Sequence, residues 1–268
     1  MPPAVFILVA PITRLGGRLL AWSRDWLDLA RFAAGAVLVA LNPATYNSAT
    51  RSVVYKQIYF TAGQILGQFT LFAALMSFVV IQIVVSTARD YGLSEFALEV
   101  VLRLLVLEVL PLLTALFVAL RSGAAINAEV ALMHIHDEIE ALRQSGVDPM
   151  HFEFIPRVIG GSLSVLALTA SSSLITLVLA YLAVYGLQPW SLADFNRVFG
   201  EVFDPFTVLV LWLKILLFGL AVTVIPITAG LSTPKKLFFA PISMLRGMVR
   251  LFFVLMLIEV GSLALKYI

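Results

Sequence analysis

The stretch RSGAAINAEVALMHIHDEIEALRQSGVDP, residues 121–149, is charged and helical in pattern, and it stands between two long apolar segments. At about 100° per residue, four apolar side chains of this stretch share one stripe: Leu132, Ile135, Ile139 and Leu142. Gly146 and Pro149 end the pattern. A short amphipathic helix between two membrane spans lies at the membrane surface or binds a partner through its apolar stripe. We therefore expect such a helix over about 124–145.

The composition is that of a membrane protein. The chain has 268 residues, of which 61% are hydrophobic and 13% charged, whereas a soluble domain averages roughly 25% charged residues. The mean hydropathy is +1.00. There is no cysteine, which excludes disulfides and thiolate metal sites. No basic patch alternates with aromatic residues, so we expect no nucleic-acid partner.

Five apolar segments meet the requirement of roughly 20 residues for a membrane-spanning helix. They cover about 57–87, 96–120, 156–187, 206–230 and 243–265. No internal repeat and no long linker divides the chain. The sequence predicts one all-α integral membrane domain over residues 1–268, with the 124–145 helix between the second and third spans.

Residues 12–32 form an amphipathic pattern before the first span. Trp22 and Trp26 lie on its apolar side, and arginines such as Arg18 lie opposite. Tryptophan on one face and arginine on the other are typical of a helix lying in the headgroup layer. The two tryptophans are the expected membrane anchors. The alternative is an amphipathic helix of a soluble cap.

The distribution of lysine and arginine predicts the orientation. Most of these residues precede the first span or follow the second and fourth spans: Arg14, Arg18, Arg24, Arg31, Arg51, Lys56, Arg121, Arg143, Arg157, Lys235, Lys236, Arg246 and Arg250. The opposite loops contain only Arg89, Arg197 and Lys266. The N-terminus and the 124–145 helix are therefore expected to be cytoplasmic, and the C-terminus to lie on the far side.

Three charged residues stand inside predicted spans at comparable depth: Glu108, Lys214 and Glu259. A charge in the hydrocarbon layer costs at least ~2.5–3.5 kcal/mol unless it is paired or hydrated. These residues form structural ion pairs between helices, or they line a substrate path. Glu99 and Arg103 are four residues apart and are expected to pair on one helix face.

Several chemistries have no support in the sequence. His134 and His136 diverge by about 200° on a helix, and His151 is isolated, so we expect no metal site. No serine elbow or HExxH is present. None of the five lysines follows a glycine, so there is no Walker A motif. The chain is not expected to be an enzyme or to bind a cofactor, and any ATP hydrolysis belongs to another subunit.

An ordered series of motifs resembles the MlaE (YrbE) permease family over roughly residues 50–230. The matching segments are Glu108-Val-Leu-Pro111, Arg121-Ser-Gly123, Ala128-Glu129, Val147-Asp148-Pro149, Pro156-Arg157 and Lys214-Ile-Leu-Leu-Phe-Gly219. The chain departs from the family where Leu110 replaces the usual glycine before Pro111. It also departs at 228–233, where the Gly- and Thr-rich stretch is reduced.

The resemblance implies the membrane subunit of an ABC transporter in the bacterial inner membrane. Its partners would be a second copy of itself, cytoplasmic ATPase subunits and a periplasmic MCE-domain protein, and its cargo would be phospholipid moved between the inner and outer membranes. The 124–145 helix would then couple to the ATPase through Glu129 and the stripe of Leu132, Ile135, Ile139 and Leu142. Glu108, Lys214 and Glu259 would line the substrate path.

Two other functions remain open. A secondary transporter would couple to ions through Glu108, Lys214 or Glu259, although such proteins usually contain internal repeats. A structural membrane scaffold would need neither the charged helix nor the intramembrane charges.

Overall fold

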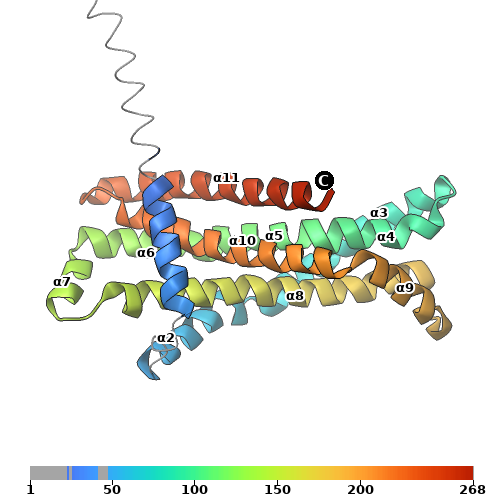
Figure 1. Cartoon of the computed structure of the whole chain (residues 1–268), viewed down its shortest axis with the longest axis horizontal. Coiled ribbons are helices and arrows are strands. Elements are labelled where there is room, and N and C mark those ends of the chain that lie inside the picture. Colours follow the sequence, from blue (N-terminus) through green and yellow to red (C-terminus); the bar gives the residue numbers. More distant parts are fainter. Residues whose placement is uncertain (1–22, 24–25, 42–47, 268) are drawn as a thin grey trace, which may run out of the picture.

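The fold is a bundle of long helices that run side by side along one axis (Figure 1). A computed structural model describes residues 23, 26–41 and 48–267, and these residues contain helices and no strand. Five helical runs are long and apolar enough to cross a membrane, as the sequence predicts. They are Arg51–Asp90, Ser94–Ile135, Met150–Tyr185, Pro205–Leu231 and Leu237–Lys266.

The first two runs are not continuous α-helices. The first consists of α2 (Ser48–Ile58), the π-helical turn η2 (Tyr59–Gly63) and α3 (Leu66–Asp90). The second consists of η3 (Ser94–Phe96), α4 (Ala97–Val101), the π-helical η4 (Leu102–Val109), α5 (Leu110–Val118), the π-helical η5 (Ala119–Gly123) and α6 (Ala124–Ile135). π-Helical turns are rare in proteins overall, but those that occur are often at functional sites. The apolar periodicity of the sequence does not predict them.

The expected single surface helix over 124–145 is wrong in its geometry. Its first part, α6, continues the second membrane run and packs along α10. Asp137, with φ of 59°, then adopts the left-handed conformation and separates α6 from α7 (Glu138–Gln144). The apolar periodicity continues through this break, because a single left-handed residue changes the direction of the chain without changing the pattern of residue types.

The second half of the chain supplies the other three runs. They contain η6 (Met150–Phe154), α8 (Ile155–Tyr185), η7 (Pro189–Ser191), α9 (Leu192–Val202), α10 (Pro205–Leu231), η8 (Leu237–Phe239) and α11 (Ala240–Tyr267). Asp204 caps α10, since its Oδ2 accepts hydrogen bonds from the backbone amides of Phe206 at 3.1 Å and Thr207 at 3.3 Å. Pro205 fits the first turn of this helix, where its missing N–H is not needed.

Small and hydroxyl side chains hold the central helices together. A Cβ on Gly219 of α10 would lie 2.7 Å from the Cα of Ser162 on α8, so only glycine permits this approach. Ser77 of α3 and Thr176 of α8 share a hydrogen bond of 2.8 Å. In contrast, a Cβ on Gly67 would meet nothing within 4 Å among the described residues, so this glycine of the Gly63–Gly67 pair makes no close helix contact there.

The helix over 26–41 crosses the bundle instead of running along it (Figure 1). It is not among the five runs that can span a membrane. Trp26 is half-buried on it, whereas Trp22 and the rest of 12–22 lie outside the described residues. The helix extends past the amphipathic stretch over 12–32 to residue 41, directly before Asn42-Pro43, where the sequence predicts the end of the pattern.

Candidate functional site

A cluster of four charged side chains joins three membrane-spanning helices. Lys214 Nζ on α10 forms ion pairs with Glu108 of η4 and, at 3.1 Å, with Oε2 of Glu259 on α11. Lys266 Nζ, also on α11, lies 3.1 Å from the other oxygen of Glu108. We call these four residues the charge quartet. Its two lysines and two glutamates balance, so the cluster carries no formal net charge.

A backbone carbonyl group that a proline leaves without its α-helical donor is a further partner of Lys214. In an α-helix the carbonyl oxygen of Leu107 would accept the N–H of residue 111, but Pro111 has none. Lys214 Nζ instead donates to this oxygen at 3.0 Å. A backbone carbonyl exposed within a membrane needs such a donor, because no water is available in the hydrocarbon layer.

The charge quartet is tightly enclosed. The side chain of Lys214 is 1% exposed and that of Glu108 15% exposed. The adjoining cavity measures only about 10 Å³, which is about the space of one water molecule. Removing one partner of a buried ion pair costs about 3–5 kcal/mol, because the other charge is left uncompensated. In this conformation the quartet therefore joins spans two, four and five.

The structure brings together the three predicted intramembrane charges. It adds Lys266, which the distribution of lysine and arginine places in the outer loops. Lys266 is seven residues after Glu259, which places both on one face of α11 two turns apart. This spacing is the feature of the sequence that could have indicated Lys266 as a member of the cluster. Glu99 and Arg103 also pair as predicted, with Nε to Oε1 at 2.8 Å, but they stand apart from the charge quartet.

The predicted ATPase-coupling residues divide into two groups. Leu132 is 41% exposed, and Ile135 and Leu142 are half-buried. Ile139 is only 6% exposed and belongs to the core of its own chain. It is therefore not available to a partner in this conformation, which corrects the prediction of one continuous apolar stripe.

Ion pairs connect α6 and the break at Asp137 with neighbouring parts of the bundle. Arg157 of α8 contacts Glu129 of α6 at 3.3 Å and Glu153 at 3.1 Å. Lys235, between α10 and η8, pairs with Asp137 at the break between α6 and α7. These contacts connect α6 with α8, and the break at Asp137 with the loop after α10. Among the described residues, no group of three or more His, Asp or Glu residues could hold a metal ion.

Comparisons with known proteins agree with this architecture. The Permease MlaE family matches residues 54–264. A probable ABC transporter permease protein of Rickettsia conorii is 27% identical over 227 residues, which cover 82% of this chain and 84% of that protein. A second probable ABC transporter permease protein, from Synechocystis, is 30% identical over 129 residues, 47% of this chain and about half (48%) of its own length.

A plant protein is also similar. The chloroplastic protein TRIGALACTOSYLDIACYLGLYCEROL 1 of Arabidopsis thaliana is 30% identical over 134 residues, which cover 47% of this chain and 36% of that protein. The family match covers more than half of the chain and includes three of the four residues of the charge quartet, all but Lys266. This chain therefore belongs to the MlaE permease family.

Proposed function

We propose that this chain is the membrane subunit of an ABC transporter that moves phospholipid. The bacterial relatives are named as probable ABC transporter permeases, and the Arabidopsis relative carries the name of a diacylglycerol lipid. The working assembly contains a second copy of the chain, cytoplasmic ATPase subunits and a periplasmic MCE-domain protein. It resides in the bacterial inner membrane, with the α6–α7 end in the cytoplasm, as the lysine and arginine distribution favours.

The charge quartet is the single observation that supports this function most strongly. Two lysines and two glutamates that are buried or half-buried between three spans are costly in a membrane and are typical of a transport pathway. We infer that the quartet is closed in this conformation and separates when the spans move. Lys214 and Lys266 then become available to the phosphate of a lipid headgroup, and Glu108 and Glu259 keep the wall polar.

The α6–α7 end is the proposed contact with the ATPase. Leu132 is exposed there, and Glu129 is paired with Arg157 on α8. An ATPase that displaces α7 would pull on α10 through the pair of Asp137 with Lys235. Because α10 carries Lys214, this route connects the partner to the charge quartet. No ATP site is proposed in this chain itself.

Purification of the intact complex from its native membrane tests the proposal. We expect mass spectrometry to identify an ABC ATPase, an MCE-domain protein and a bound phospholipid with this chain. Recovery of the chain with no ATPase would contradict the ABC assignment and would favour an ion-coupled transporter. Recovery of the ATPase with a cargo other than lipid would reject the lipid assignment alone.

A further inference from the structure

An apolar groove opens between four helices on one side of the bundle. Its walls come from the helix over 26–41, α2, α8 and α10, and its volume is about 640 Å³. Sites that hold small molecules in proteins measure roughly 300–1,000 Å³, so the groove is large enough for a ligand. Its apolar walls include Val37, Ile58, Ile159, Leu163, Leu216 and Leu220. We call this the α2–α8 groove.

Glycines hold the walls of the α2–α8 groove close together. A Cβ on Gly160 of α8 would lie 2.7 Å from the Cγ of Gln57 on α2. A Cβ on Gly219 of α10 would lie 2.7 Å from the Cα of Ser162 on α8. Both glycines are next to lining residues in the sequence, and protein interiors leave few voids larger than a water molecule. The groove is therefore a feature of a closely packed bundle and not a consequence of loose packing.

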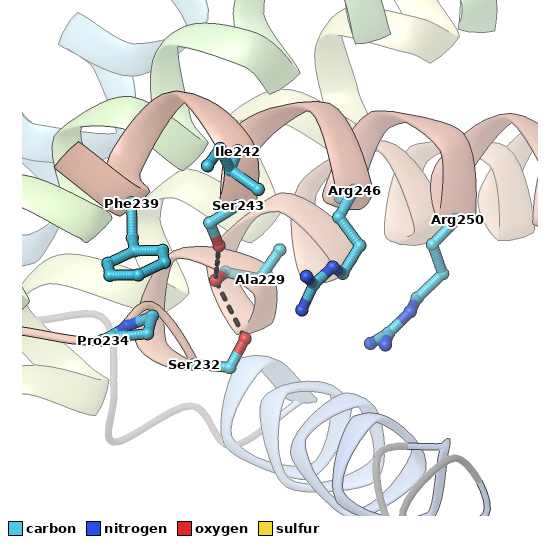
Figure 2. A pocket seen from close by; sticks show the side chains of 9 residues that line it. Ala229, Ser232, Pro234, Phe239, Ile242, Ser243, Arg246 and Arg250 are labelled. Carbon is cyan, nitrogen blue, oxygen red and sulfur yellow. Dashed lines mark hydrogen bonds between the residues drawn. The ribbon is translucent and has the colours of Figure 1, made fainter. Parts of the chain in front are cut away.

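The cavity between α10 and α11 is of a different kind (Figure 2). Its volume is about 150 Å³, and serine and arginine side chains form part of its walls. The carbonyl oxygen of Ala229 accepts hydrogen bonds there from Ser232 Oγ at 2.9 Å and Ser243 Oγ at 3.0 Å. This cavity is too small and too polar for a hydrocarbon chain, whereas the α2–α8 groove is neither.

The α2–α8 groove extends through one leaflet of the membrane. Arg51, one of its lining residues, is the first residue of the first membrane-spanning run. Leu216 and Leu220 stand on either side of the midpoint of α10. The groove therefore leads from the end of one span to the middle of another. This depth is that of a lipid acyl chain, which covers half of the roughly 30 Å hydrocarbon core.

The polar side chains of the groove are at the membrane surface. Arg51 is the one charged residue among the described residues that line it. Its side chain is exposed and forms no hydrogen bond or ion pair with any residue that the structure describes. Tyr55, one turn later on α2, is 69% exposed, and tyrosine is enriched at the membrane interface. One end of the groove is therefore positive and polar, and the remainder is apolar.

We propose that the α2–α8 groove holds a phospholipid, with one acyl chain between the four helices and the phosphate at Arg51. An apolar groove offers water few hydrogen-bond partners, whereas an acyl chain makes van der Waals contacts along its walls. The guanidinium of arginine donates two parallel hydrogen bonds to phosphate oxygens. The lipid has a structural role, because it fills the space between the helix over 26–41 and the spans.

This site is separate from the charge quartet. Leu216 lines the groove and Lys214 belongs to the quartet, and residues two apart on a helix point about 200° away from each other. The groove and the quartet are therefore on different sides of α10. The proposed lipid does not depend on phospholipid being the cargo.

Photochemical labelling of the intact complex tests this proposal. The complex would be placed in liposomes with a phosphatidylethanolamine that has a diazirine in one acyl chain, extracted into a neutral detergent, freed of unbound lipid and irradiated. We expect labelled peptides from α2 and α8 at the groove. Ile159→Trp fills the groove and should reduce this labelling at least about tenfold, because the ligand is excluded. The matched control is Val84→Trp in another apolar cavity, of about 380 Å³, beside α3 and α4, which should leave the labelling unchanged.

Two parallel samples identify the ligand and its role. A free fatty acid offers the same hydrocarbon chain, so one sample contains a diazirine fatty acid in place of the phospholipid. Labelling of the groove by the fatty acid and not by the phospholipid would overturn the proposal. The other sample receives ATP before irradiation. The phospholipid should remain in the groove, and its loss with ATP would place the groove on the transport path and contradict a structural role.

The wild type alone can contradict the proposal, since an unlabelled groove in the intact complex would mean that no phospholipid is held there. Equal labelling in the wild type and Ile159→Trp would also overturn it, and so would an equal loss in Val84→Trp. If Ile159→Trp does not fold, Val54→Trp fills the groove from the opposite wall on α2. These failures would leave the proposed function intact, because that function is tested by the chains and the cargo that co-purify.

Discussion

Lys214 Nζ on α10 donates a hydrogen bond of 3.0 Å to the carbonyl oxygen of Leu107 on η4. This oxygen has no α-helical donor, because residue 111 is a proline. The same ammonium group pairs with Glu108 and Glu259. One side chain therefore donates to a backbone acceptor and forms ion pairs with two carboxylates from two other spans, which explains how a lysine that is almost fully buried can remain in a membrane protein.

Replacement of Lys214 should greatly destabilise the bundle. We expect Lys214→Met to lower the free energy of unfolding by about 3–5 kcal/mol, because two carboxylates lose their ion-pair partner and one carbonyl loses its donor. Thermal unfolding of the purified protein in detergent measures this effect. The matched control is Lys235→Met, whose ion pair with Asp137 is exposed. Similar unfolding temperatures for the two variants would show that the charge quartet does not stabilise the bundle.

The close contact between α8 and α10 leads to a second prediction about stability. Gly219→Ala would place its Cβ 2.7 Å from the Cα of Ser162, a backbone atom that cannot rotate away. We expect a loss of about 1–3 kcal/mol from this overpacking. Gly261→Ala on α11 is the control, because its Cβ would meet nothing within 4 Å and alanine favours a helix over glycine. Equal stability of the two variants would contradict the packing described here.

The sequence predicts the membrane spans of this structure better than the local breaks in its helices. Five spans follow from apolar length alone, and the meeting of Glu108, Lys214 and Glu259 follows from their similar depths. The π-helical turns and the left-handed Asp137 do not follow, because they change the register or direction of the backbone without changing the apolar pattern. For the same reason, Ile139 was predicted to face a partner and instead enters the core.

Substitutions on the two sides of the break at Asp137 distinguish an effect on partner binding from an effect on folding. Leu132→Asp changes an exposed side chain on α6, so we expect the chain to fold and to lose its ATPase. Ile139→Asp buries a charge in the core of the chain, so we expect it to reduce the amount of folded protein. Co-purification of the ATPase and gel filtration measure the two effects. Full retention of the ATPase by folded Leu132→Asp would remove α6 from the coupling surface.

The cap of α10 should make stability depend on pH. The hydrogen bond from the Thr207 side chain, together with the backbone amides of Thr207 and Phe206, holds the pKa of Asp204 below its ordinary value of 3.8. A carboxylate with a lowered pKa in the folded state stabilises the fold above its unfolded pKa, and this stabilisation is lost as the pH falls through the folded value. Asp204→Ala should therefore melt below the wild type at pH 7, and the difference should shrink below about pH 3.8. A difference that stays constant with pH would show that the carboxylate charge has no role in the cap.

Transfer of phospholipid by the reconstituted complex tests the central claim most directly. The complex of this chain with its ATPase and MCE-domain partner would be placed in liposomes that contain a fluorescent phospholipid, and arrival of that lipid in acceptor vesicles would be measured with and without ATP. The predicted result is ATP-dependent transfer by the wild type, and transfer reduced at least about tenfold by Glu108→Ala, which removes the carboxylate shared by Lys214 and Lys266. Absence of ATP-dependent transfer by an intact wild-type complex, or wild-type transfer by Glu108→Ala, would contradict the account.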